Sequence, residues 1–552
     1  MLKNPYDVPI EQRGASSKNM TALPGHRRSQ WERNAIVTQR LILTLLVSCT
    51  PLWATTYYVD NCVTVGNDRN NGASPSTPWL TVNKVNTSTF NPGDSILFES
   101  TCTWREQLTP PSPGSAGSPI TFGAYGTGAA PIISGADLFT SWTPSSGSVY
   151  YASYSTAPNQ VFEDGARLPR NTVSAASLTA GHWYLDAVNS RIWVYLTAGD
   201  SPSGHTMEVS QLVYTLLVRQ SYLIFRSLVF TKGNDGNVVV NGAAFVNFPN
   251  DESSLGGSSG YTIEGASSYI TIQNGSTHDN GGVYDSNGIG IGGFGNASSY
   301  VTVTGVDIYG NTRQGVDIAL PSNAGQHNSS ITMEWCRLHN NGSAGYEVDG
   351  GSTALVFAYN LVYGNATLGT SINTGADGSE PEVLVCNNVI YGNGSDNVLH
   401  AANYAGGSTI YKNNIIAQGG GQEIDAYPGT NLLSNYNDVY HSAGGTFMSY
   451  GGANYTFAGW KTASGQDANS QNADPEFVNA AASQFWLAGG SPAIDAGTNL
   501  GSPYNIGLMP RSAWPNSVVT GDQNAYGSGW EIGAYIYVPA LAPPTNLQAV
   551  AH

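Results

Sequence analysis

The chain has 552 residues, of which 40% are apolar and 11% are charged, and its formal net charge at pH 7 is −17. The apolar content supports a large core, while the charged fraction lies far below the roughly 25% of an average globular protein, which excludes a coiled coil and a charge-driven disordered chain. With 38 acidic against 21 basic residues, the chain offers no basic face, and we expect no nucleic-acid partner.

The first predicted element is an export signal within residues 1–55. Residues 41–47 form a short apolar run that follows four arginines and leads to Ala54. This order is typical of a secretory signal, and the run is far shorter than the roughly 20 residues of a membrane span. Residues 46–49 also resemble a bacterial lipoprotein box, in which Cys49 would carry lipid. We expect a secreted, extracellular or periplasmic protein, and prefer cleavage near Ala54 over lipid anchoring.

Export permits disulfides, and among the five cysteines Cys62 and Cys102 are the natural pair. Cys336 and Cys386 are expected to behave as buried apolar side chains. Along the chain we expect five parts after the signal, with an N-terminal cap and first coils at 56–137, an insert at 138–215, a main coil at 216–445, C-terminal coils with a closing motif at 446–538, and a linker or truncated module at 539–552.

The insert is expected to form short antiparallel strands, with turns at Asp164–Gly165 and at residues 188–190. Its aromatic side chains are expected to build a small core of their own, in preference to a wall on which sugars stack.

An internal repeat over residues 222–440 decides the fold. Residues 300–311, 330–341, 354–365 and 382–393 realign as an alternating apolar strand, a polar kink, a second short strand and a Gly/Asn turn, and a third strand follows. Its inward anchors recur every 24 to 30 residues, namely Ile291, Ile318, Val348, Ile372, Leu399 and Ile424. Three short strands per turn predict an all-β parallel β-helix solenoid, because a sandwich or propeller needs hairpins every 8–12 residues.

Asparagines at equivalent kinks, Asn360, Asn388 and Asn414, predict a stacked ladder of side-chain amides inside the coil.

These repeats resemble the secreted right-handed parallel β-helix superfamily of pectate-lyase-like polysaccharide enzymes. Residues 57–72, 92–98 and Trp104 look like the usual entry into such coils, and residues 491–497 with 531–535 look like a closing motif. The insert looks like the small β-rich insert of some β-helix glycoside hydrolases. The resemblance implies the architecture and a saccharide partner, but the superfamily holds lyases, hydrolases, epimerases and non-catalytic proteins, so the fold alone does not give the reaction.

Side chains alternate in direction along each third strand, so residues that flank the inward anchors are expected to face solvent in two columns. The residue before each anchor gives Gly290, Asp317, Glu347, Ser371, Val398 and Glu423. The residue after each anchor gives Gly292, Ala319, Asp349, Asn373, His400 and Asp425. Since coils stack about 4.8 Å apart, we expect Asp317, Glu347 and Asp349 to cluster, with Asn373 and His400 just beyond.

Crowded carboxylates raise the pKa of one member, so that one group holds a proton while another stays ionised. Glycoside hydrolysis needs such a pair, and an inverting enzyme separates it by roughly 6.5–9.5 Å. We expect Glu347 or Asp349 to act as the acid and Asp317 as the base. Substrate binding is expected from Asn373, His400, Arg313, Glu423 and Asp425, on a polysaccharide or oligosaccharide, by a monomer that requires no metal or other cofactor.

Two alternatives stay open. Clustered acidic and amide oxygens also suit Ca²⁺, in which case the resemblance implies a polysaccharide lyase. The cation would neutralise a uronate, and Arg313, Arg337, Lys412 or His400 would remove a proton. The sparseness of Lys and Arg in the repeats favours the hydrolase. The second alternative is a non-catalytic surface or adhesion protein, which the lipoprotein-like Cys49 would suit.

Overall fold

The structure, a computed structural model, describes residues 54–282, 286–375, 377–379, 381–401, 407–428 and 431–539. The predicted export segment up to residue 53, with Cys49, and the predicted linker from residue 540 onward lie outside these residues. Of the two helices longer than a single 3-10 turn in the described part, α2 (Val82–Asn86) and α3 (Phe457–Ser464), neither is long and apolar enough to cross a membrane.

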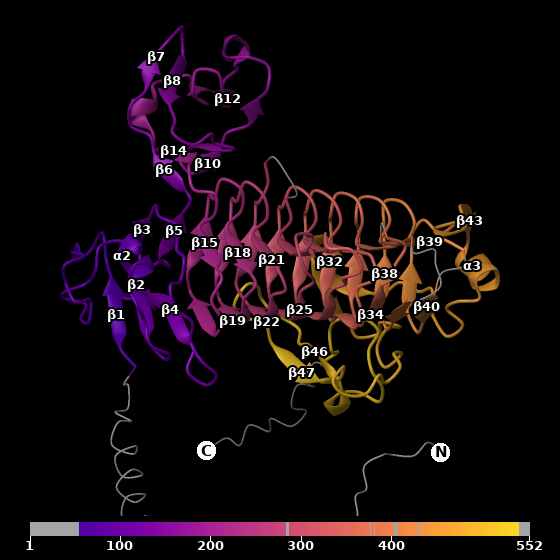
Figure 1. The fold of residues 1–552 in the computed structure, drawn as a ribbon. Coiled ribbons are helices and arrows are strands. Elements are labelled where there is room, and N and C mark those ends of the chain that lie inside the picture. The colour runs from indigo at the N-terminus through magenta and orange to yellow at the C-terminus, as the bar shows by residue number, and fades with distance from the viewer. Residues whose placement is uncertain are drawn as a thin grey trace, which may run out of the picture. The chain divides into compact units, whose positions relative to one another are not determined.

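Three long, almost wholly parallel sheets wind along one coil, which confirms the predicted parallel β-helix (Figure 1). The first sheet contains β1 (Thr56–Val59), β2 (Ser95–Glu99), β4 (Ile120–Tyr125), β16 (Leu223–Arg226), β19 (Ala244–Pro249), β22 (Ser268–Gln273), β25 (Ser299–Thr304), β28 (Ser329–Glu334), β31 (Leu355–Ala358), β34 (Glu382–Cys386), β37 (Ser408–Lys412) and β40 (Leu432–Asn435).

The second sheet contains β3 (Thr103–Trp104), β5 (Ile132–Ser134), β17 (Val229–Thr231), β20 (Glu252–Ser254), β23 (Ser276–His278), β26 (Asp307–Tyr309), β29 (Arg337–His339), β32 (Leu361–Tyr363), β35 (Val389–Tyr391), β38 (Ile415–Ala417) and β41 (Asp438–Tyr440). The third contains β15 (Leu216–Val218), β18 (Val238–Asn241), β21 (Tyr261–Glu264), β24 (Ile289–Gly292), β27 (Val316–Ala319), β30 (Tyr346–Asp349), β33 (Thr370–Asn373), β36 (Val398–Ala401), β39 (Ile424–Ala426), β42 (Met448–Tyr450) and β43 (Ala453–Tyr455).

The core lies inside the coil and consists of apolar side chains stacked in register. On the third sheet Ile291, Ile318, Val348 and Ile372 face one another from successive coils, and each is at most 1% exposed. Branched aliphatic side chains fit this pleated, fully buried position. The anchors that were predicted for these four coils are therefore correct.

Two ladders of asparagine amides line the corners of the coil. The predicted ladder is confirmed, since Asn360 donates to Asn388 at 3.1 Å and Asn388 donates to Asn414 at 3.0 Å. A second, longer ladder at the corner before the third sheet was not predicted, and each of its amides donates to the next in the order Asn237, Asn280, Asn311, Asn341, Asn365, Asn393 and Asn397. Both ladders satisfy polar groups in the interior that would otherwise be buried without partners.

The predicted insert of antiparallel strands is present. One of its sheets contains β6 (Ala136–Leu138), β9 (Val161–Glu163), β10 (Ala166–Arg167) and β14 (Met207–Ser210). The other contains β7 (Thr143–Pro144), β8 (Val149–Ser153), β11 (Arg170–Asn171), β12 (His182–Asp186) and β13 (Arg191–Tyr195). Trp183, Val161 and Ile192 are buried in a core of the insert's own, as expected. Cys62 and Cys102 form the predicted disulfide.

Residues 473–538 pack on the outside of the coil, and we call them the C-terminal cover. They include β44 (Phe477–Asn479), β45 (Gln484–Leu487), β46 (Ile506–Leu508) and β47 (Thr520–Asp522). Trp335 Nε1 donates to the Ile506 carbonyl at 3.0 Å, and Trp514 Nε1 donates to the Trp335 carbonyl at 2.9 Å. The free cysteines Cys336 and Cys386 are both buried, as expected.

Candidate active site

The outer face of the third sheet carries a column of residues in register. In chain order it reads Val239, Thr262, Gly290, Asp317, Glu347, Ser371, Leu399 and Asp425. Two residues further along the same strands, Asp349 pairs with Asn373. The sequence therefore placed Asp317, Glu347, Asp349 and Asn373 correctly, on three successive coils and on one outer face.

Asp317 is the member of this carboxylate cluster whose pKa lies nearest to neutral pH. Burial raises its pKa to about 7, helped by the negative charges of Glu347 and Asp349, while a hydrogen bond from Asn287 and the charge of Arg313 act in the opposite direction. Asn287 Nδ2 donates to Asp317 Oδ2 at 3.1 Å. The other oxygen, Oδ1, is buried and has no hydrogen-bond partner among the described residues.

Glu347 and Asp349 are tied to each other through one amide. Asn373 Nδ2 lies 3.1 Å from Glu347 Oε1 and 3.0 Å from Asp349 Oδ1, so these two oxygens lie within about 6 Å of one another. Gln314 Nε2 donates to the second oxygen of Glu347. Burial raises the pKa of Glu347, as does the charge of Asp349, while the bonds from Gln314 and Asn373 lower it. Since an amide fills the space between them, Glu347 and Asp349 do not form the 6.5–9.5 Å pair of an inverting enzyme.

A groove of about 780 Å³ adjoins Asp317 on the side toward the earlier coils. Asn287, Gly290, Gly292, Gly293 and Ala319 give it a floor of small and polar residues, and Phe294, 67% exposed, stands in its wall. The groove also contains Tyr214, Asp235, Ser258, Ser259, Thr262 and Glu264. The proton-holding carboxyl therefore borders a concavity large enough for sugar units.

The predicted outward position of His400 is wrong. His400 pairs with Ile372 and Ala426, is 1% exposed, and neither ring nitrogen has a hydrogen-bond partner among the described residues. Burial lowers its pKa to about 4. Leu399 instead faces outward beside Ser371. Val398 and Leu399 are both apolar, so the alternation of apolar and polar residues allows either one to point inward. The structure turns Val398 and His400 inward and Leu399 outward.

The predicted exposure of Glu423 is wrong as well. Glu423 is fully buried and ends the longer amide ladder, since it accepts from Asn397 Nδ2 at 2.5 Å and from the Gly419 amide at 3.0 Å. His441 Nδ1 lies 2.8 Å from Glu423 Oε1, the oxygen that also accepts from the Gly419 amide. A ladder in which every amide donates forward needs an acceptor at its last member, which explains a carboxylate at this position.

Asp425 faces outward as predicted, but in the column of Glu347 and three coils beyond it. Its predicted place in the column of Asp349 is wrong, because His400 and then Ala426, and not Leu399 and Ile424, follow Ile372 in the inward column. Arg313 is exposed, and its positive charge lowers the pKa of both Asp317 and Glu347. Of the five predicted substrate-binding residues, the structure thus brings Asn373 and Arg313 to the carboxylate cluster.

Four polar residues of this face were missed. Asn287 and Gln314 each stand three residues before an outward position of the column, Gly290 and Asp317, and each donates its amide to the carboxylate of the following coil. Asp235 and Glu264 line the groove, and burial raises the pKa of both. The common spacing of Asn287 and Gln314, three residues before an outward position, would have predicted both residues. Continuing the outward columns to earlier coils would have predicted Asp235 and Glu264.

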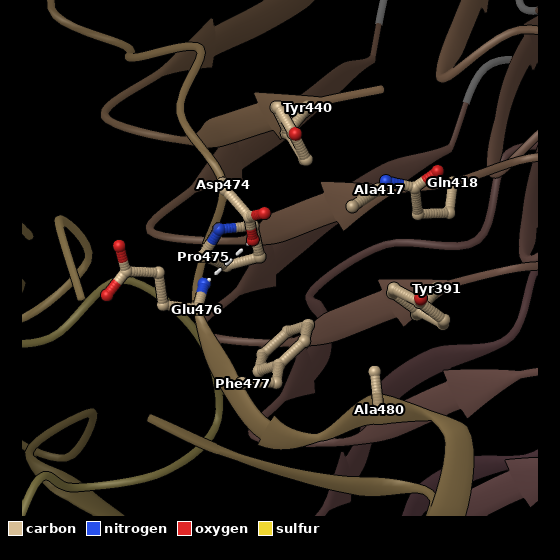
Figure 2. A pocket seen from close by; sticks show the side chains of 9 residues that line it. All are labelled: Tyr391, Ala417, Gln418, Tyr440, Asp474, Pro475, Glu476, Phe477 and Ala480. Atoms are coloured by element: carbon tan, nitrogen blue, oxygen red, sulfur yellow. Dashed lines mark hydrogen bonds between the residues drawn. The ribbon is translucent and has the colours of Figure 1, made fainter. Parts of the chain in front are cut away.

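A second, smaller pocket of about 290 Å³ lies elsewhere, between the second sheet and the C-terminal cover. Figure 2 shows Ala417 between the strands that carry Tyr440 and Tyr391, with the segment from Asp474 to Ala480 alongside. No residue of the carboxylate cluster lines it. Among the described residues, the cluster that could hold a metal by spacing is Asp60 with Cys62 and Cys102, whose sulfurs are joined in the disulfide.

Comparison with known proteins supports the fold. Residues 216–383 match the family model described as right handed beta helix region. The solved structure of pectate lyase Pel9A superposes with a TM-score of 0.51 at 16% identity, covering 88% of this chain and 97% of that one. The structure of XylC with xylose gives a TM-score of 0.49 at 12% identity, covering 77% of this chain and 87% of that one. At 16% identity, the likeness to pectate lyase Pel9A shows the fold alone.

One curated protein matches locally. A lacto-N-biosidase of Bifidobacterium longum subsp. longum is 41% identical over 76 residues, which is 13% of this chain and 5% of that protein. The match therefore spans a small part of either chain.

Proposed function

We propose that this chain is an exported glycoside hydrolase that cleaves an oligosaccharide or polysaccharide at the groove beside Asp317. The observation that carries the proposal is a carboxyl group with a pKa of about 7 that borders a 780 Å³ groove next to two further carboxylates. The local likeness to a lacto-N-biosidase supports a saccharide substrate.

The pKa values favour an assignment opposite to that expected from sequence. Asp317 has the pKa that suits a general acid near neutral pH, and its Oδ1 has no hydrogen-bond partner in the described part of the chain. In its protonated form it donates a proton to the glycosidic oxygen, so that the leaving sugar departs as an alcohol. Asp349, diagonal to Asp317 at about 8 Å as judged from strand spacing, then acts as the general base. It takes a proton from a water molecule whose oxygen bonds to the sugar carbon from the opposite face as the glycosidic bond breaks.

Glu347 has a supporting role in this arrangement. Both of its oxygens accept hydrogen bonds, from Gln314 and from Asn373, which fixes its orientation. Its negative charge raises the pKa of Asp317 and so keeps the acid protonated.

The test is a panel of plant, algal and bacterial polysaccharides, scored both for new reducing ends and for the ultraviolet absorbance of an unsaturated uronate. We expect reducing ends without absorbance, no effect of EDTA, and at least a 100-fold loss of rate in Asp317→Asn and in Asp349→Asn, as for removal of general acid–base groups. Asp425→Asn, in an outward carboxylate outside the groove, is the matched control and keeps wild-type rates.

The same panel separates the alternatives. An absorbing product that EDTA abolishes identifies a Ca²⁺-dependent lyase, for which Arg313 is the nearest exposed cation. Retention of polysaccharide with no product from any member of the panel identifies a binding protein. Wild-type rates in both Asp317→Asn and Asp349→Asn contradict the proposed site.

A further inference from the structure

Gly290 is a glycine that the backbone does not require. Its φ lies outside the left-handed region, and a Cβ built on it meets nothing closer than 3.8 Å. Gly292, two residues later on the same strand, differs, because its φ is +82° and a Cβ there comes within 2.6 Å of the Ala319 carbonyl oxygen. A glycine in mid-strand costs roughly 0.5–1 kcal/mol relative to alanine, so Gly290 needs another explanation.

The position of Gly290 supplies one. It lies in the outward column between Thr262 and Asp317, where any side chain would project into the groove. Asp317 and Asn287 both line the groove, and the Oδ1 atom of each is buried without a hydrogen-bond partner among the described residues. Buried acceptors without donors are costly unless a ligand or water supplies the hydrogen.

The charge of the groove narrows the class of ligand. Asp235, Glu264 and Asp317 line it, and no lysine or arginine stands among its described lining residues. A negative field disfavours a uronate, whereas a neutral sugar carries no charge for this field to repel. Phe294, in the same wall, offers an aromatic surface for the C–H face of a sugar ring.

We propose that the space above Gly290 is a subsite for one uncharged pyranose ring next to the cleaved bond, and that the missing side chain of Gly290 determines which substrates fit. The role of this subsite in catalysis rests on the proposed function, but sugar binding at the subsite can be measured without turnover.

The test is calorimetric binding of xylotriose, lacto-N-tetraose and trigalacturonate to the full chain, for wild type and the size series Gly290→Ala, Gly290→Val and Gly290→Leu. We expect at least one neutral oligosaccharide to bind and trigalacturonate not to bind. Affinity should fall with side-chain size, by about tenfold or more for leucine, which corresponds to about 1.4 kcal/mol. Melting temperatures should not fall in Gly290→Ala and should rise slightly, because alanine removes the conformational cost of the glycine and its Cβ meets only ordinary contacts at 3.8 Å or more.

Asp425→Leu places the same leucine side chain in the same column outside the groove and should bind as wild type. Unchanged affinity in Gly290→Leu, tighter binding of trigalacturonate than of both neutral sugars, or no binding of either neutral sugar overturns the proposal. Binding that depends on Gly290 without release of reducing ends leaves the subsite standing and removes the hydrolase. Release of reducing ends at the same rate in wild type and Gly290→Leu supports the hydrolase and contradicts the subsite.

Discussion

Asn287 donates its side-chain amide to Asp317 Oδ2 across one coil at 3.1 Å, and this bond holds down the pKa of the candidate acid. Asn287→Leu removes a donor that stabilises the ionised form, so the pKa of Asp317 should rise, by about one to two units for a bond to a charged group. The alkaline limb of the pH–rate profile should move upward by the same amount, and carboxyl NMR of Asp317 should report the shift independently of activity.

Gln314→Leu provides the comparison, because Gln314 donates to Glu347 instead of Asp317. It should leave the bond from Asn287 intact and raise the pKa of Glu347. An Asn287→Leu enzyme whose alkaline limb and carboxyl resonance both stay at wild-type positions would show that this bond does not set the acidity of Asp317.

Glu423 should matter for stability and not for turnover. Glu423→Leu leaves Asn397 Nδ2 and the Gly419 amide buried without their acceptor, and each such loss costs about 1–3 kcal/mol. We expect urea unfolding to show a loss of about 2–4 kcal/mol, with kcat and KM near wild type when assayed well below the transition. A selective rise in KM without loss of stability would restore Glu423 to the substrate-binding set.

His400 should make the coil sensitive to acid. Burial lowers its pKa to about 4. Between about pH 4 and 6.5 the imidazole is therefore protonated in the unfolded chain and neutral in the folded chain. Stability should fall as the pH drops from about 6.5 toward 4, by up to about 3 kcal/mol. In His400→Leu this part of the pH dependence should disappear, as measured by melting temperature at pH 7.5, 5.5 and 4. Equal slopes in wild type and variant would contradict the burial of a neutral imidazole.

Glu334 should have the opposite effect. It pairs with Ala358 on the outer face of the first sheet, and burial raises its pKa to about 7. The folded chain then holds a proton that the unfolded chain has lost, so stability should fall as the pH rises from about 4.5 to 7. Glu334→Gln should be more stable than wild type at pH 8, by on the order of 1–3 kcal/mol, and equal to it at pH 4.

Glu382→Gln is a control for the loss of a carboxylate, since Glu382 is an exposed residue of β34 in the same sheet. A Glu334→Gln protein whose melting temperature differs from wild type equally at pH 8 and pH 4 would show that the substitution acts through packing and not through titration.

The fold was predictable because its determinants are local and periodic. Two kinds of residue recur once per coil: an aliphatic side chain, as at Ile318, Val348 and Ile372, and an asparagine, as at Asn360, Asn388 and Asn414. Because the strands of successive coils stack in register, residues that recur in this way contact one another. The prediction of Asp317, Glu347 and Asp349 on one face followed from the same periodicity. The longer ladder was missed although its asparagines recur in the same way, because they were assigned to turns.

The errors arose where two registers satisfied the same pattern. In the strand from Val398 to Ala401 either of two adjacent apolar residues could point inward, and the sequence does not show that the coil buries His400 without a hydrogen-bond partner among the described residues. The sequence also does not show which carboxyl group has the highest pKa. That depends on how deeply Asp317 is buried relative to Glu347 and on which side-chain amide donates to which carboxylate oxygen.

The longer ladder of asparagine amides gives the coil a direction. Every rung passes its hydrogen forward, from Asn237, which accepts from the Gly233 amide, to Glu423, which donates nothing onward when ionised. Deletion or duplication of one whole coil between these ends would keep every amide paired with the next. Removal of the coil that contains Glu423 would leave the last amide, Asn397 Nδ2, without this acceptor. Shortening the solenoid is therefore expected to be tolerated in its middle and not at its final turn.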